Sequence, residues 1–397
     1  MNKYIKMVTI TNNVPVKDNV FAWGMSRVNA RLFTALSCNI SLNICTNNYY
    51  HYKYNEIVDE IRGKTILLPR FPRIVKFMNR YFNRSINQDT LLINELQKLV
   101  KKIKQTNSNW IFCPCGVNPY DLGRGVELSK ACGLPLAVYL VDDFVSGAVL
   151  SGNKDHFDVA NRDIPIWLKY AKQIFVISEG LQQRIKSMYN LESVLLPLPY
   201  DSFFNATNLE NKKKRDQIMF VGNLSHFYVD GIKEIAAVIK SINEEHNCDL
   251  KLRFTIPNTV EIKKVIGDYE FIISECFNDI NAMYYEISQS LLCYVPYSFK
   301  EEYKEMVSSS FPSKILDMLA AGRFVVVYGP EYSTSISYFK QNNLPFVLYN
   351  NDINELKKTI LYQIQNDFNY SKEYNETLKR NHSAQKIAEK ILNTLDQ

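Results

Sequence analysis

The segment 311–323 carries residue types whose spacing suits a charged ligand. A proline followed by Ser313 favours the start of a helix, and Gly322 favours its end before a β-branched run. The first turn of such a helix offers unpaired N–H groups, a hydroxyl and the Lys314 side chain, which together favour an anion. Asp317 follows one turn later on the same face, where a carboxylate can accept hydrogen bonds from a diol such as a ribose. These spacings suit a nucleoside diphosphate, although a capped helix before a strand is also ordinary α/β scaffolding.

The string Pro-Ser-Lys-Ile-Leu-Asp-Met-Leu-Ala-Ala-Gly, residues 312–322, has a strand-and-loop segment before it at 292–297. Together they resemble the donor-binding segment of GT-B-fold glycosyltransferases, especially those like glycosyltransferase family 4. The resemblance implies that Asp317 holds the ribose of a nucleotide sugar. It also implies that the helix start, with Ser313 and Lys314, meets the diphosphate.

Further donor-binding positions are implied by the same resemblance. Gly222 ends the first strand of the second half, where a glycine lets the backbone approach a diphosphate closely. The family commonly has an Arg and a Lys shortly after this glycine, and a Glu at the position of Ser309, and this chain departs from both patterns. The additional donor-binding residues are Gly24, Gly222, Asn223, Glu275, Phe277, Tyr297 and Ser309.

No Asp-x-Asp pair precedes the predicted donor site in a plausible place. We therefore expect no cofactor and a metal-independent reaction, in which the helix dipole and Lys314 stabilise the leaving diphosphate.

Two adjacent carboxylates, Asp142 and Asp143, follow the apolar run 136–141. They therefore lie at the carboxyl end of a predicted strand, where open α/β sheets bind their ligands. One of them could orient or deprotonate an acceptor hydroxyl, and a solvated turn or helix cap is the alternative. Other candidates, each as consistent with a surface or packing role, are His156, His226, and Asp18 with the Trp23-Gly24 loop.

The elements that position these residues alternate between strand and helix along the whole chain. Strands are expected at 7–11, 42–45, 65–68, 110–113, 136–141, 174–177, 217–224, 251–256 and 270–273. Helices are expected at 24–37, 91–105, 123–132, 163–171, 179–189, 230–243 and 279–289. Such alternation predicts parallel sheets with helices on both faces.

The polar, Lys-rich stretch 205–217 interrupts this alternation and is typical of a linker. The predicted fold is therefore α/β, with two doubly wound, Rossmann-like domains facing a cleft as in GT-B proteins. We expect an acceptor-binding domain at 1–205 and a donor-binding domain at 206–372. The resemblance implies that a final helix, within 373–397, returns to the first domain.

The segment 70–84 is basic and amphipathic, and it is the second informative feature of the sequence. On a helical wheel its positive side chains fall within about 80° of one another, next to an apolar and aromatic side. These positive residues are Arg73, Lys76, Arg80 and Arg84. The pattern indicates an interfacial helix on an anionic membrane, and a surface helix with a solvated basic face is the alternative.

Charge supports an anionic partner for the first half. Residues 1–205 hold 25 basic and 16 acidic side chains, a net charge of +9, whereas the remainder carries −3. A membrane or a nucleic acid would fit this asymmetry, but a nucleic-acid binder would not explain segment 311–323. We therefore expect no nucleic-acid partner.

Composition places the chain among globular proteins. With 397 residues and 46% hydrophobic residues it is long enough for two cores, and no apolar run approaches the roughly 18 residues of a membrane span. The eight cysteines show neither a zinc spacing nor a short disulfide framework, so free thiols are expected, including Cys113 and Cys115. We expect no secretory signal and a cytoplasmic protein, peripheral at the inner face of the plasma membrane if segment 70–84 binds lipid.

These patterns together predict a hexosyl-transferring glycosyltransferase that uses a nucleotide-diphosphate sugar. Its expected acceptor is a glycan or lipid-linked glycan of bacterial surface polysaccharide assembly. Two alternatives remain open: a GT-B-fold sugar-nucleotide epimerase, and a catalytically silent partner subunit.

Overall fold

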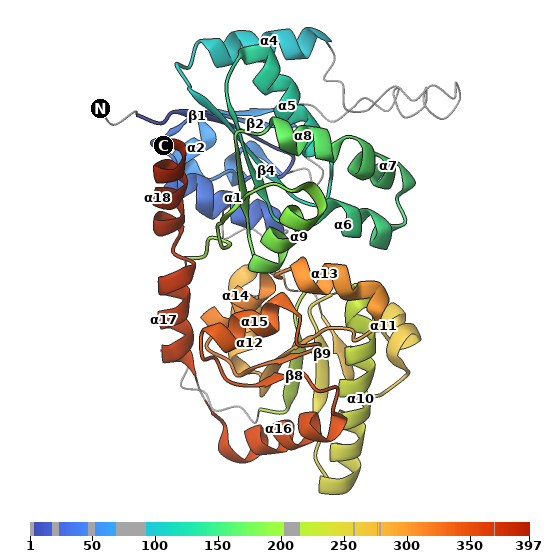
Figure 1. Cartoon of the computed structure of the whole chain (residues 1–397). Coiled ribbons are helices and arrows are strands. Elements are labelled where there is room, and N and C mark those ends of the chain that lie inside the picture. Colours follow the sequence, from blue (N-terminus) through green and yellow to red (C-terminus); the bar gives the residue numbers. More distant parts are fainter. Residues whose placement is uncertain are drawn as a thin grey trace. The chain divides into compact units, whose positions relative to one another are not determined.

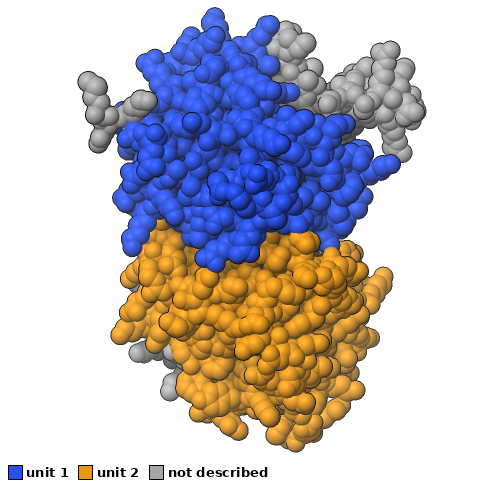
Figure 2. Space-filling model, in the orientation of Figure 1, with its two compact units in different colours: residues 1–199, 384–397 blue, residues 200–383 orange. Residues whose placement is uncertain are grey.

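The computed structural model describes residues 4–17, 24–46, 52–68, 93–201, 215–256, 259–275, 277, 279–368 and 370–397. The predicted basic helix at 70–84, with Arg73, Lys76, Arg80 and Arg84, lies outside these residues, as do Asp18, Trp23 and most of the predicted linker. The chain divides into two compact units, coloured separately in Figure 2. Unit 1 comprises residues 1–199 and 384–397, and unit 2 comprises residues 200–383.

Unit 1 is built on a seven-stranded sheet in the order β3-β2-β1-β4-β5-β6-β7. All of its strand pairs are parallel. The strands are β1 (Met7–Thr11), β2 (Ile40–Cys45), β3 (Thr65–Leu67), β4 (Trp110–Cys115), β5 (Leu136–Leu140), β6 (Gln173–Val176) and β7 (Val194–Leu195). The strands β1 and β5 are buried along their whole length, and β5 is apolar or aromatic throughout. The two threonines of β1 are satisfied by side chains, because Thr9 donates to Asn43 and Thr11 accepts from Asn29.

The helices of unit 1 follow the strands in alternation (Figure 1). They are α1 (Gly24–Ala35), α2 (Asp59–Arg62), α4 (Ile93–Lys104), α5 (Tyr120–Cys132), α6 (Phe144–Ser151), α7 (Lys154–Arg162), α8 (Ile164–Tyr170), α9 (Glu179–Tyr189) and α18 (Ala384–Leu395), with a 3₁₀ turn at Tyr54–Glu56. The apolar face of α18 is buried, and this helix packs against α1. The last helix of the chain therefore belongs to unit 1.

Unit 2 repeats the arrangement on a six-stranded parallel sheet in the order β10-β9-β8-β11-β12-β13. Its strands are β8 (Gln217–Phe220), β9 (Lys251–Phe254), β10 (Ile272–Ser274), β11 (Leu292–Pro296), β12 (Val325–Tyr328) and β13 (Val347–Leu348). Its helices are α10 (His226–His246), α11 (Thr259–Ile266), α12 (Ile280–Gln289), α13 (Lys304–Ser309), α14 (Lys314–Ala320), α15 (Thr334–Gln341), α16 (Ile353–Asn366) and α17 (Ser371–Asn381), with a 3₁₀ turn at Glu301–Tyr303.

Both sheets reverse their strand order at one place. In unit 1 the reversal lies between β1 and β4, and in unit 2 it lies between β8 and β11. In open parallel sheets the loops at the carboxyl ends of two such strands diverge, which leaves room for a ligand. In unit 2 this room lies beside the residues that follow β8 and β11.

The end of the chain differs from the sequence prediction. We expected one helix over about 373–395, but the chain forms two, α17 and α18, shown in red in Figure 1. His382 interrupts the helix with φ −121° and ψ 4°, and its buried ring is held by a 2.9 Å hydrogen bond with Tyr338 and by stacking on Phe311. Because α17 packs on α14 while α18 packs on α1, the chain changes units between the two helices.

Several elements were not predicted, among them α2, α11, α13, α15, α16 and β13. Two more, the helices α6 and α7, occupy 144–162, a stretch that contains glycines and short apolar runs without a clear helical period. Caps define them instead, because Asp143 and Asn153 accept hydrogen bonds from backbone N–H groups of the first turns.

The described cysteines are free thiols, as expected. Cys113 and Cys115 lie on β4 with their sulfur atoms 3.6 Å apart, both fully buried. No helix among the described residues is long and apolar enough to cross a membrane.

Candidate functional site

The loop after β8 has the geometry that the sequence predicts for it. Gly222 adopts φ +88°, a conformation that side-chain-bearing residues rarely accept. Its backbone N–H donates a 2.8 Å hydrogen bond to the Thr255 hydroxyl, which follows β9. A Cβ atom at position 222 would lie 3.5 Å from Cδ of Lys314. The structure therefore brings together two residues that lie 92 positions apart and were both predicted to meet a diphosphate.

The amine of Lys314 lies against two aromatic rings. Its Nζ is 4.0 Å from the ring centroid of Phe220 and 3.9 Å from that of Tyr228. Burial lowers the pKa of this amine to about 7, while desolvated cation–π contacts favour its charged form by roughly 2 kcal/mol. No carboxylate of the described residues forms an ion pair with it. An anionic ligand could supply the missing negative charge.

Ser313 occupies the N-cap position of α14, as predicted, but its hydroxyl makes no capping hydrogen bond. The side chain is partly exposed and stands next to Lys314 in the chain. Asn223, after Gly222, is exposed. Both side chains are therefore at least partly open to solvent.

Asp317 is engaged within the protein. Its side chain is 5% exposed, and its Oδ1 accepts a 2.7 Å hydrogen bond from the hydroxyl of Tyr284 on α12. The hydroxyls of Tyr284 and Tyr200 lie 2.8 Å apart, which extends the chain of polar groups. Asp317 thus ties α14 to α12, and a ribose would have to share or replace this contact.

Glu275 and Phe277 converge on a residue that the sequence prediction missed. Arg253, 7% exposed, lies 2.5 Å from Glu275 and 2.8 Å from Glu286, and its guanidinium stacks 5.3 Å from the ring centroid of Phe277. A buried charge needs such partners, because an unpaired one costs several kcal/mol. The sequence feature that could have indicated this residue is a charged side chain within the predicted strand 251–256.

Two predicted donor residues have their side chains inside the unit. Tyr297 is fully buried, and its hydroxyl lies 2.6 Å from that of Ser335. Ser309 is 2% exposed and donates a 2.7 Å hydrogen bond to the carbonyl of Glu305 in its own helix. Their side chains therefore serve packing and local backbone bonding in this structure.

In unit 1 the adjacent carboxylates follow β5, as predicted, and they differ from each other. Asp143 caps α6 through the N–H groups of Val145 and Ser146, and it forms a 2.8 Å ion pair with Arg184. Asp142 has no such partner among the described residues, and burial together with the neighbouring Asp143 raises its pKa to about 7. A carboxyl group with this pKa can accept or give a proton near neutral pH.

The remaining predicted site residues among those described are His156, His226 and Gly24. His156 packs edge-on against Tyr120, and its burial lowers its pKa. His226 is exposed at the first turn of α10, and Gly24 is exposed at the start of α1. No three His, Cys, Asp or Glu side chains gather as a metal site would require within the described ranges.

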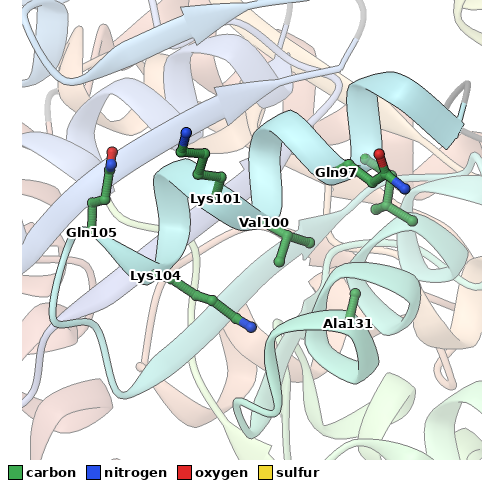
Figure 3. A pocket seen from close by; sticks show the side chains of 7 residues that line it. Gln97, Val100, Lys101, Lys104, Gln105 and Ala131 are labelled. Carbon is green, nitrogen blue, oxygen red and sulfur yellow. The ribbon is translucent and has the colours of Figure 1, made fainter.

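Unit 1 also has an open groove of about 550 Å³ between α4 and α5 (Figure 3). It is lined by Leu96, Gln97, Val100, Lys101, Lys104, Gln105 and Ala131. None of the residues predicted to bind the donor or to act in catalysis lines it.

Two Rossmann-like units with parallel sheets in one chain define the GT-B fold, which confirms the predicted fold class. The chain is similar to Anabaena HepE solved in complex with UDP, with 12% identity, a TM-score of 0.64, and coverage of 98% of this chain and 99% of that one. It is also similar to a Staphylococcus aureus TarM variant solved with UDP, with 11% identity, a TM-score of 0.62, and coverage of 98% and 99%.

A third similar structure is a Listeria monocytogenes protein assigned as a UDP-N-acetylglucosamine 2-epimerase. It has 12% identity and a TM-score of 0.53, over 98% of this chain and 95% of that one. No family model and no curated protein matches this sequence. At these identities the similarity establishes the fold, and the closer relation to glycosyltransferase family 4 stays a prediction.

Proposed function

We propose that the protein is a glycosyltransferase that moves a hexosyl group from a nucleotide-diphosphate sugar to a hydroxyl of an acceptor. The observation that carries this proposal is the Lys314 side chain beside Gly222, at the strand-order reversal of unit 2. In our proposal Lys314 and Ser313 hold the diphosphate, Asp317 holds the ribose, and Glu275 and Phe277 flank the base. UDP-bound structures of similar fold support a nucleotide sugar as the donor class.

The acceptor side of the proposal rests on Asp142. Its pKa of about 7 leaves a useful fraction of the carboxylate available to take a proton from an acceptor hydroxyl. The proposed acceptor is a glycan or lipid-linked glycan of bacterial surface polysaccharide assembly. We also propose that the transfer needs no metal, because Lys314 offsets the charge of the leaving diphosphate. Activity that is lost in EDTA and restored by a divalent cation would reject this point.

A donor-hydrolysis assay separates the candidate functions. Purified protein is incubated with UDP-glucose, UDP-N-acetylglucosamine, GDP-mannose and dTDP-glucose, and the products are resolved by chromatography. Slow release of free sugar from one donor supports a transferase. Conversion of one nucleotide sugar into its epimer would favour the epimerase instead, a function suggested by the Listeria structure. Binding without turnover would favour a silent partner subunit, consistent with Ser309 at the position where the family often has a Glu.

We propose further that segment 70–84 docks the protein on anionic membranes at the inner face of the plasma membrane. Each basic residue near such a surface contributes about 1 kcal/mol, and salt weakens the attraction. Replacing Arg73, Lys76, Arg80 and Arg84 by Glu should abolish sedimentation with anionic liposomes while leaving nucleotide affinity unchanged. Equal sedimentation of the two proteins would rule the segment out as the docking site.

A further inference from the structure

Three features define the surroundings of the Lys314 amine. It lies over the rings of Phe220 and Tyr228, at 4.0 Å and 3.9 Å from their centroids. It forms no ion pair with a described residue, and Cδ of the same side chain would lie 3.5 Å from a Cβ atom at Gly222. Ring faces attract a cation but hold no proton acceptor, so this environment tolerates the charged form without fixing it.

The surrounding elements supply no counter-ion. The ionisable groups on α10 and α14, besides Lys314 itself, are His226, Tyr228, Asp230, Lys233, Glu234, Lys240, Glu244, Glu245, His246 and Asp317. Each carboxylate among them has another partner: Asp230 pairs with Lys300 at 3.2 Å, Asp317 accepts from Tyr284 at 2.7 Å, Glu234 bonds with Tyr328, Glu244 pairs with Lys240 and Glu245 pairs with Lys357. Among the described residues, the amine therefore has no carboxylate partner.

This arrangement makes the charge of the amine depend on what binds. Burial lowers its pKa to about 7 in the free protein, so much of the amine is uncharged at and above neutral pH. A diphosphate placed against it would favour the charged form strongly and raise the pKa again. The additional proton has to come from the solvent.

We propose that binding of the nucleotide-diphosphate donor is coupled to the uptake of one proton by the Lys314 amine, so that the ligand generates the cation that holds it. This inference rests on the proposed function, because it takes the donor diphosphate as the ligand. Linkage then requires affinity to fall by about tenfold per pH unit above the midpoint of the free amine, until the pH reaches that of the bound amine.

Calorimetry measures the coupling directly. UDP-glucose is titrated into the full chain at pH 8 in phosphate and in Tris, two buffers with different ionisation enthalpies. This ligand is a diphosphate diester, so its own phosphates do not titrate near neutral pH. We expect an uptake of roughly 0.5 to 1 proton per bound nucleotide. If UDP-glucose does not bind, GDP-mannose, dTDP-glucose and ADP-glucose replace it.

Three variants assign the proton to its residue. Lys314→Arg keeps a permanent charge and should bind without proton uptake and with little dependence on pH. Lys314→Met should bind weakly, also without uptake. His226→Gln is the matched control, because His226 is an exposed basic side chain at the first residue of α10, and this variant should retain the uptake of the wild type.

The reactivity of the amine tests the free protein without a ligand. Acetylation of Lys314 by acetic anhydride, followed by mass spectrometry against pH, should show a midpoint near pH 7 to 8, well below the value of about 10.4 for an exposed lysine. A midpoint near that ordinary value overturns the inference. Nucleotide binding with less than about 0.2 proton taken up also overturns it, yet leaves the proposed function standing. Failure of every nucleotide to bind overturns both.

Discussion

One carboxyl group in unit 1 and one amine in unit 2 reach nearly the same pKa from opposite directions. Burial raises the pKa of Asp142 to about 7 and lowers that of Lys314 to about 7. Asp142 has a like charge beside it, Asp143, whereas Lys314 has ring faces beside it. Burial can thus bring both a carboxyl group and an amine to a pKa near neutral pH, and the neighbouring groups decide which ligand or reaction restores the charge.

The largest expected effect is at the carboxyl group of Asp142. Asp142→Asn removes the proposed proton acceptor, so the rate of sugar transfer should fall by roughly 10²- to 10⁴-fold while nucleotide affinity stays unchanged. Asp155→Asn, at an exposed position on α7, is the control and should keep the wild-type rate. The rate is measured with the donor and acceptor that support turnover. An unchanged rate in Asp142→Asn would remove this residue from the mechanism.

A smaller effect is expected at the neighbouring carboxylate. Arg184→Met leaves Asp143 buried without its cation, which should lower the free energy of unfolding by about 3 kcal/mol in a urea titration. Lys186→Met, on the same helix but with an exposed ion pair, should cost less than about 0.5 kcal/mol. Similar losses in the two variants would contradict the contrast between a buried pair and a surface pair.

In unit 2, Lys314→Met should remove a charge-assisted contact with the nucleotide. Nucleotide binding should weaken by roughly 1.5 to 3 kcal/mol, or about 10- to 150-fold. Lys240→Met, which changes an exposed lysine on α10, should leave affinity unchanged. Calorimetry at pH 6.5, where much of the wild-type amine is charged, gives the clearest difference. Wild-type affinity in Lys314→Met would separate this residue from the donor.

The sign of the pH dependence distinguishes the two groups most directly. The raised pKa of Asp142 adds a penalty to the folded state that develops from about pH 4 upward and is complete above about pH 7, so Asp142→Asn should be more stable than wild type at pH 8. The lowered pKa of Lys314 adds a penalty that develops as the pH falls below about 10 and is complete below about pH 7, so Lys314→Met should gain stability at pH 6 and lose this gain toward pH 10.

Each of these gains in the free energy of unfolding is expected to be roughly 1 to 2 kcal/mol. This is less than the full pKa shift would give, because water reaches both sites and screens their charges. Thermal unfolding of the three proteins from pH 5 to 9 measures them. The stability gain of Asp142→Asn should grow with rising pH, and that of Lys314→Met should shrink. If both gains changed in the same direction, the two pKa shifts would not be opposite in sign.

Much of the fold was accessible from the sequence because its elements are locally consistent. The run Met7–Thr11 is a buried strand over all five residues, and the helix Glu179–Tyr189 begins at a Ser cap and ends at Asn190 in the left-handed conformation. The two short helices after β5 were missed because their caps, rather than an apolar period, define them.

The candidate site was only partly accessible. Glycine and lysine could be assigned from local patterns, but the aromatic contacts of Lys314 come from Phe220 and Tyr228, more than 80 positions earlier in the chain. Helical spacing placed Asp317 on a face, yet it could not reveal that Tyr284 would occupy its carboxylate. Such contacts depend on tertiary packing, which a single sequence does not display.

The hydrogen bond between the backbone N–H of Tyr200 and the carbonyl of His382, 2.6 Å long, joins the first and nearly the last residue of unit 2. Unit 2 is therefore an insertion whose two ends meet. Because its ends meet, excising residues 200–383 and joining 199 to 384 should require only a short bridge, with little loop-closure entropy lost. A gene fragment encoding 200–383 should thus yield a module that can be produced and studied by itself.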